Sequence, residues 1–109
     1  MGQLFYGSSE QPIRIPDRVL AHVKVVIATK LRRGESFTMS WRHVDDEAGG
    51  RSTIWIQPSI PLRFVFGSVE PEILDPALLQ TYANSANSSS GLTIDLGVAA
   101  PAEAPVRTA

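Results

Sequence analysis

The stretch from Asp17 to Gly34 constrains this chain most, because it has the marks of an amphipathic helix. Its apolar residues recur with the three- and four-residue spacing that gathers them on one helical face. These residues are Val19, Leu20, Val23, Val26, Ile27 and Leu31. Asp17 suits the N-cap position, and Gly34 suits the left-handed residue that ends a helix. The rest of the chain must therefore supply a surface that covers this apolar face.

Two further features of this helix bear on possible partners. Ala21, Val25 and Ala28 form a smaller apolar stripe roughly opposite the main one, which predicts either burial on both sides or an interface with a second copy. Lys30 projects near the main apolar face. We expect its stem to lie along the core and its ammonium to reach solvent, and an anion contact is the alternative interpretation.

The other elements follow from alternating apolar residues and from turn residues. The sequence predicts strands at 3–6, 12–15, 35–43, 52–57, 62–66 and 92–96 and a second helix at 76–87. Asp75 followed by Pro76 is expected to form the N-cap and first position of this second helix. The three strands between the helices are expected to form an antiparallel meander. The predicted fold is therefore α+β, in the order β-β-α-β-β-β-α-β, with a single mostly antiparallel sheet and two helices on one face.

Length and composition limit the organisation of the chain. The 109 residues suffice for one domain, expected over residues 1–96, and the alanine- and proline-rich residues 97–109 are expected to be a disordered tail. No apolar run is long enough to cross a bilayer and no signal-like segment is present, so we expect a cytoplasmic protein without a membrane partner. With no cysteine and two histidines in different elements, no disulfide, metal site or cofactor is expected.

The clearest candidate for binding is the sheet face that points away from the helices. There the predicted strands would place one tryptophan beside three arginines, a combination on which single-stranded nucleic acid stacks. An ordinary surface cation–π pair is the alternative. The basic end of the first helix would add phosphate contacts, or would only complement the helix dipole. The nucleic-acid-binding candidates are Arg14, Arg42, Trp55, Arg63, Lys30, Arg32 and Arg33.

Catalytic chemistry has little support in the sequence. His43 lies near Asp45, Asp46 and Glu47, which would suit an oriented base or a hard cation, but a solvated acidic turn has the same composition. No nucleophile in a matching context follows. We therefore predict no catalytic residue and no metal ligand.

Three segments carry a resemblance to known sequences: KLRRGESF at residues 30–37, GRSTIWIQPSIPLRFVF at 50–66 and SANSSSGL at 85–92. With these, residues 1–96 resemble a family of short actinobacterial proteins of unknown function, whose members are often labelled ATP-dependent DNA ligase. The label implies a role near nucleic acid. A nucleotidyl-accepting lysine would require a Lys-x-Asp-Gly setting, which neither Lys24 nor Lys30 has, so the resemblance implies an accessory role rather than catalysis.

Two functional hypotheses follow. The first is a small non-catalytic binding or interaction module that forms a homodimer through Ala21, Val25 and Ala28 or through an exposed sheet edge. The alternative is an accessory protein of DNA repair or ATP-dependent DNA ligation that binds single-stranded or duplex DNA.

Overall fold

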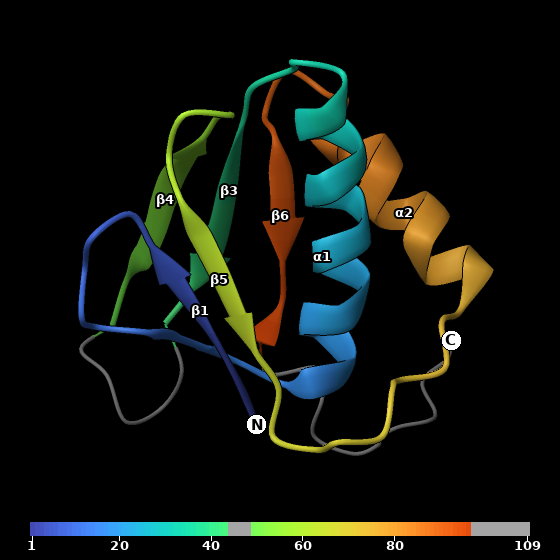
Figure 1. Ribbon diagram of the computed structural model, residues 1–109. Coiled ribbons are helices and arrows are strands. Elements are labelled where there is room, and N and C mark those ends of the chain that lie inside the picture. The colour runs from blue at the N-terminus through green and yellow to red at the C-terminus, as the bar shows by residue number, and fades with distance from the viewer. Residues whose placement is uncertain (44–48, 97–109) are drawn as a thin grey trace.

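The computed structural model describes residues 1–43 and 49–96, and Figure 1 shows its elements. They are β1 (Gly2–Tyr6), β2 (Ile13–Ile15), α1 (Asp17–Arg32), β3 (Phe37–Arg42), β4 (Arg51–Ile56), β5 (Leu62–Val65), α2 (Pro76–Ala86) and β6 (Leu92–Ile94). The predicted α+β class and the predicted element order are confirmed. The acidic loop at 45–47 and the predicted tail at 97–109 lie outside the described residues.

The strands form two sheets, so the prediction of a single sheet is wrong. One sheet has the order β2-β1-β5 and the other has the order β4-β3-β6. All pairings are antiparallel except that of β3 with β6. The predicted meander ends after β4, because β5 pairs with β1 instead.

Prolines explain why β5 leaves β4. Pro58 and Pro61 have no N–H to donate to a hairpin ladder. The carbonyl of Pro61 accepts a hydrogen bond from the N–H of Gly7 at 2.9 Å, which directs the next strand onto β1. The side chain of Tyr6 also donates a hydrogen bond to the carbonyl of Trp55, so the two sheets remain joined at this point.

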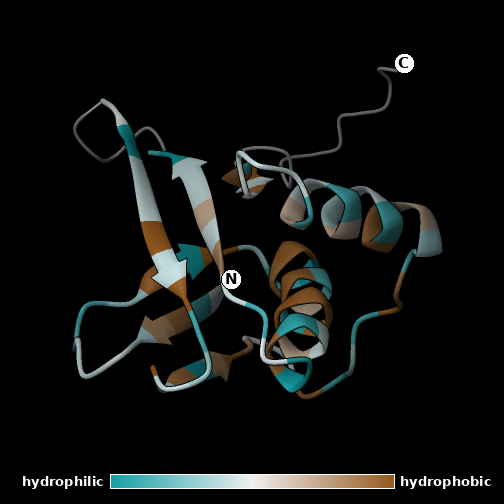
Figure 2. Cartoon of the chain, turned by 90° about the horizontal axis from the view of Figure 1, so that it is seen from above, coloured by the Kyte–Doolittle hydropathy of each residue, from teal (hydrophilic) through white to brown (hydrophobic). Residues whose placement is uncertain are grey.

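The helix α1 supplies the centre of the core. Five of the six residues of its predicted apolar face are buried, and Leu31 is half-buried. Phe37, Met39 and Trp41 of β3 are buried as their alternation predicted. Seen along its axis, α1 lies between the strands and α2 (Figure 2), and α2 packs on α1 and β6.

The ends of the helices show one correct and one wrong prediction. Asp75 caps α2 by accepting the N–H of Ala77 at 2.9 Å. Asp17 does not cap α1: the helix begins at Asp17 itself, with Pro16 before it and no side-chain cap. The carboxylate of Asp17 instead accepts the N–H of Gly67 at 3.0 Å, because a long-range donor competes for the same oxygen atoms.

Candidate nucleic-acid interface

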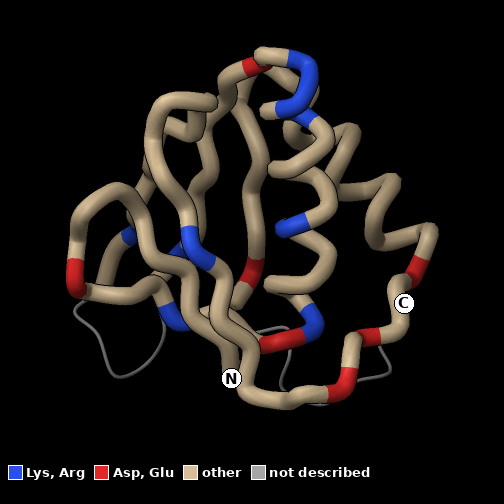
Figure 3. Tube along the Cα trace, viewed as in Figure 1, with Lys and Arg blue, Asp and Glu red and all other residues tan. Residues whose placement is uncertain are grey.

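The seven predicted nucleic-acid-binding residues do not share one face, because the strands that carry them belong to two sheets. Arg42 and Trp55 lie on β3 and β4, whereas Arg14 and Arg63 lie on β2 and β5 of the other sheet. Lys30, Arg32 and Arg33 lie at the end of α1, where Figure 3 shows a basic cluster beside Glu35. The single platform expected from the sequence is therefore three separate groups.

The outer side of the β4-β3-β6 sheet carries the most coherent group. In the register of β3 with β4, Thr38 lies opposite Trp55, and Ser40 lies opposite Thr53. The next pair on the same side is Arg42 with Arg51. Thr93 of β6 continues the middle row beside Ser40. We call this surface the Trp55 face; it consists of Thr38, Ser40, Arg42, Arg51, Thr53, Trp55 and Thr93.

The Trp55 face has an aromatic end, a hydroxyl centre and a cationic end. Trp55 is 52% exposed, as its alternation predicted. In the centre, the hydroxyls of Ser40 and Thr53 are hydrogen-bonded to each other at 2.8 Å. Arg51 lies four residues from Trp55 on the same strand, about 13 Å away at the rise of a β-strand. A ligand that contacts both ends is therefore extended.

Arg51 is a candidate that the sequence analysis missed. The strand predicted from the sequence begins at residue 52, whereas β4 begins at Arg51. The prediction therefore leaves Arg51 outside the hairpin. The N–H of His43 donates to the carbonyl of Gly50 at 2.9 Å, and this bond closes the hairpin with Arg42 opposite Arg51. Both arginines are exposed, and neither has a carboxylate partner within residues 1–43 and 49–96. The alternation of residues 51, 53 and 55 was the available signal.

The arginines of the other sheet have different surroundings. The guanidinium of Arg63 lies 5.5 Å from the ring centroid of Phe5, a cation–π contact that is common on sheet surfaces. Arg14 lies opposite Gln3 in the register of β2 with β1. This pair involves Phe5, so it is separate from the cation–π pair with Trp55 that the sequence offered as the alternative.

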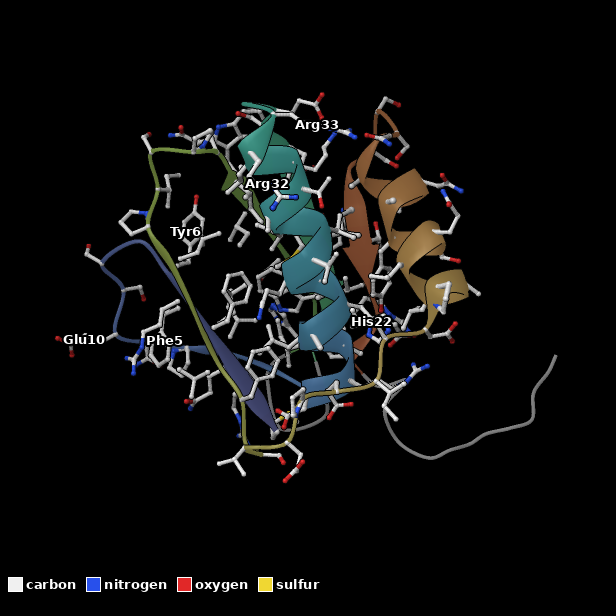
Figure 4. All side chains as sticks on the ribbon, turned by 45° about the vertical axis from the view of Figure 1, so that its right-hand side comes forward. Phe5, Tyr6, Glu10, His22, Arg32 and Arg33 are labelled. Atoms are coloured by element: carbon white, nitrogen blue, oxygen red, sulfur yellow. The ribbon has the colours of Figure 1, made fainter. Side chains whose placement is uncertain are left out.

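Lys30 has structural partners. Its ammonium donates to the side-chain oxygen of Asn87 at 2.8 Å and lies 3.2 Å from the carboxylate of Glu35. It also lies 5.8 Å from the ring centroid of Phe37. The side chain is only 12% exposed, so the stem lies along the core as predicted. Figure 4 shows Arg32 and Arg33 at the end of α1, and both are exposed.

The helix α2 lies next to part of the apolar stripe that was predicted to form a dimer interface. Val25 faces a groove between the two helices, together with Leu79 and Ala83 of α2. Ala21 is half-buried and Ala28 is exposed. The second helix therefore covers part of the surface that the sequence offered to a partner.

His22 is a buried polar residue whose role the sequence did not reveal. It is fully buried between α1 and α2 (Figure 4). Its Nε2 accepts the backbone N–H of Asp75 at 2.8 Å, so the ring proton lies on Nδ1, which donates to the carbonyl of Arg18 at 2.6 Å. Arg18 also pairs with the Asp75 carboxylate at 3.2 Å. These contacts hold the start of α2 against α1.

His43 lies at the end of the hairpin of β3 and β4, where its N–H donates to the carbonyl of Gly50 at 2.9 Å. Its Nε2 lies 2.8 Å from the hydroxyl of Ser52. Within residues 1–43 and 49–96, no three His, Cys, Asp or Glu side chains are grouped so that they could hold a metal ion.

Among the described helices, none has the length and apolar character needed to cross a membrane.

The fold and this surface define a small α+β domain with an exposed aromatic and cationic sheet face. The chain belongs to the family DUF7882, a domain of unknown function, which matches residues 1–96. The family description names no activity and no source, so it supports the predicted uncharacterised family but neither the ligase label nor an actinobacterial origin. No curated protein and no solved structure matches the chain.

Proposed function

We propose that this protein is a small non-catalytic binding module that takes single-stranded nucleic acid on its Trp55 face. The observation that carries the proposal is the register of β3 with β4, which places Arg42, Arg51 and Trp55 on one exposed side. The arginines of the other sheet are not part of this surface.

The aromatic end accounts for base binding. Trp55 is 52% exposed, and its neighbours on the face carry small hydroxyl side chains that leave the ring accessible. A base that stacks on such a ring contributes about 1 to 3 kcal/mol, with little dependence on sequence. Bases in a duplex are already stacked on each other, so this end favours a single strand.

The cationic end accounts for backbone binding. Arg42 and Arg51 lie directly opposite each other, and like charges in that position destabilise a hairpin. A phosphate between the two guanidinium groups would remove this repulsion and accept charge-assisted hydrogen bonds from both. One hydroxyl of the hydrogen-bonded pair Ser40 and Thr53, together with that of Thr93, supplies further donors of the kind that position a sugar–phosphate backbone.

Two more specific hypotheses, a role in DNA repair or ligation and a homodimer, each need their own evidence. An accessory role in DNA repair or ATP-dependent ligation, which the family resemblance implies, requires DNA binding by this face. A homodimer through Ala21, Val25 and Ala28 has less support, because Val25 faces α2. The test for the dimer is the mass in solution of a Val25→Glu protein, which should fall relative to wild type if the stripe is an interface.

The test of nucleic-acid binding is a titration of tryptophan fluorescence with single-stranded and duplex oligonucleotides at low and moderate salt. We expect saturable quenching that weakens with salt, with dissociation constants of roughly 1 to 100 μM. Trp55→Phe should abolish the quenching, whereas Trp41→Phe should retain it, because Trp41 is buried. The duplex should bind more weakly than the single strand.

Matched arginine variants make the test specific to this face. Arg42→Gln and Arg51→Gln should each weaken binding and lower the salt slope by about 0.7 for each lost phosphate contact. Arg63→Gln removes an equal charge from the other sheet and should leave affinity nearly unchanged. No quenching at tens of micromolar protein, or an equal loss in the Arg63→Gln protein, would refute the proposal.

A further inference from the structure

A groove between α1 and α2 is a second candidate site, separate from the Trp55 face. Val25 and Val26 of α1 form one wall, and Leu79 and Ala83 of α2 form the other. Lys30 and Arg33 lie at one end. The groove has a volume of about 250 Å³, just below the range of roughly 300 to 1,000 Å³ of small-molecule sites, so it suits a small ligand.

The groove exists because polar contacts hold the two helices together at both ends. At the start of α2, the backbone N–H of Asp75 donates to His22 at 2.8 Å. Beyond its last turn, Asn87 accepts from Lys30 at 2.8 Å. Between these contacts, the small side chain of Ala83 cannot fill the space opposite α1. The two contacts join the helices on either side of the gap.

The groove has a mixed lining, and the polar Thr29 in it is already hydrogen-bonded. Thr29 also lines the groove, but its hydroxyl donates to the carbonyl of Val25 in the preceding turn at 2.8 Å. The bond satisfies the hydroxyl donor within the helix. An apolar group would therefore enter the groove without displacing a hydrogen bond from the wall.

The cationic end selects for the opposite charge in a ligand. The side chain of Lys30 is only 12% exposed, and two of the three donors of its ammonium have partners in Asn87 and Glu35. The guanidinium of Arg33 is exposed, with no ion-pair partner in the described part of the chain. Figure 4 shows Arg33 at the end of α1, and Arg33 is one of the residues that line the groove. A carboxylate at this end would pair with Arg33 and take the remaining donor of Lys30.

We infer that this groove binds a small carboxylate with an apolar tail, such as a short alkanoic acid. The tail lies between the valines of α1 and the Leu79 and Ala83 side chains of α2. The carboxylate lies at Lys30 and Arg33. This site does not depend on nucleic-acid binding, so either proposal stands if the other fails.

The test is calorimetric titration of the wild-type protein with the straight-chain alkanoates from butanoate to octanoate. Affinity should rise about fourfold with each methylene until the groove is full, and then level off. The alkylamine and the alcohol of the best chain length should each bind at least tenfold more weakly. No binding of any alkanoate at about 10 mM, or equal binding of the amine, would overturn the inference.

Matched variants locate the site. Arg33→Gln should weaken alkanoate binding about tenfold, whereas Arg32→Gln removes the same charge from the neighbouring residue and should have no effect. Ala83→Leu should fill the groove and abolish binding in a protein whose circular dichroism is unchanged. If Ala83→Leu fails to fold, the arginine pair decides the outcome. Equal losses in the two arginine variants, or a change of mass in solution on titration, would contradict a small-carboxylate site.

Discussion

Gly91→Ala is the substitution for which the structure makes the strongest stability prediction. Gly91 is buried at the entry to β6, with a φ of +81° that side-chain-bearing residues rarely adopt. A Cβ there would lie 2.1 Å from the hydroxyl of Thr38 and 2.7 Å from its backbone carbonyl oxygen. The hydroxyl can rotate away, but the carbonyl belongs to β3, so β6 must shift relative to its neighbour.

The size of the effect is the sum of two contributions. The left-handed conformation costs alanine about 1 to 2 kcal/mol, and forcing an extra carbon into a packed site costs roughly 1 to 3 kcal/mol. We therefore expect Gly91→Ala to lower the free energy of unfolding by about 2 to 5 kcal/mol. Urea denaturation followed by circular dichroism measures this directly.

Gly34→Ala is the matched control for the backbone contribution. Gly34 has a similar φ of +73°, but nothing lies within 4 Å of the position of an added Cβ. This variant should lose only the backbone contribution of about 1 to 2 kcal/mol. If the two variants lose the same amount, the close approach of Gly91 to β3 does not matter and the packing argument is refuted.

Three further predictions concern the helices and the Trp55 face. His22→Phe should cost about 1 to 3 kcal/mol in urea denaturation, because it leaves the N–H of Asp75 without its acceptor. Burial raises the pKa of Tyr82, with a smaller opposing effect of Arg18; its contribution to stability is complete below pH 10 and declines as pH rises above that value. Tyr82→Phe should therefore flatten the alkaline part of the stability profile. Arg51→Glu should raise the free energy of unfolding by about 0.3 to 1 kcal/mol and weaken oligonucleotide binding.

The sequence predicted the parts of the fold that depend on local periodicity. The buried face of α1 and the Asp75 cap of α2 are set by residues within a few positions of each other, so both could be predicted. The pairing of β5 with β1 could not, because it depends on a contact between Pro61 and Gly7 that is distant in sequence. The same limit explains why Asp17 binds Gly67 instead of capping its own helix.

The candidate sites also combine features that local sequence patterns predict with features that depend on tertiary packing. The exposure of Trp55 follows from strand alternation and was predicted. The separation of Arg14 and Arg63 from Trp55 follows from sheet membership, which no local pattern reveals. The groove depends on how α2 packs on α1, and a helix pattern does not specify which helix faces it will meet. Local patterns therefore identified individual candidate residues but not their combination.

The directly opposed Arg42 and Arg51 bear on both the stability of the hairpin and the proposed binding of a ligand. A hairpin optimised for stability alone would place an opposite charge or a neutral residue at one of these positions, since directly opposed like charges are unfavourable. The exposed ring of Trp55 lies on the same face. The opposed arginines are the feature of this sheet face that departs from a local stability rule, and our proposal that the face binds a ligand accounts for it, because such departures concentrate at functional sites.

Arg51→Glu separates this explanation from a purely structural one. If the arginines are kept for a ligand, the variant gains stability through a new cross-strand ion pair with Arg42 while it loses affinity for the oligonucleotide. Urea denaturation and fluorescence titration measure the two effects on the same protein. A loss of stability would instead mean that Arg51 makes a stabilising contact in the free domain, and the paired arginines would then need no ligand to explain them.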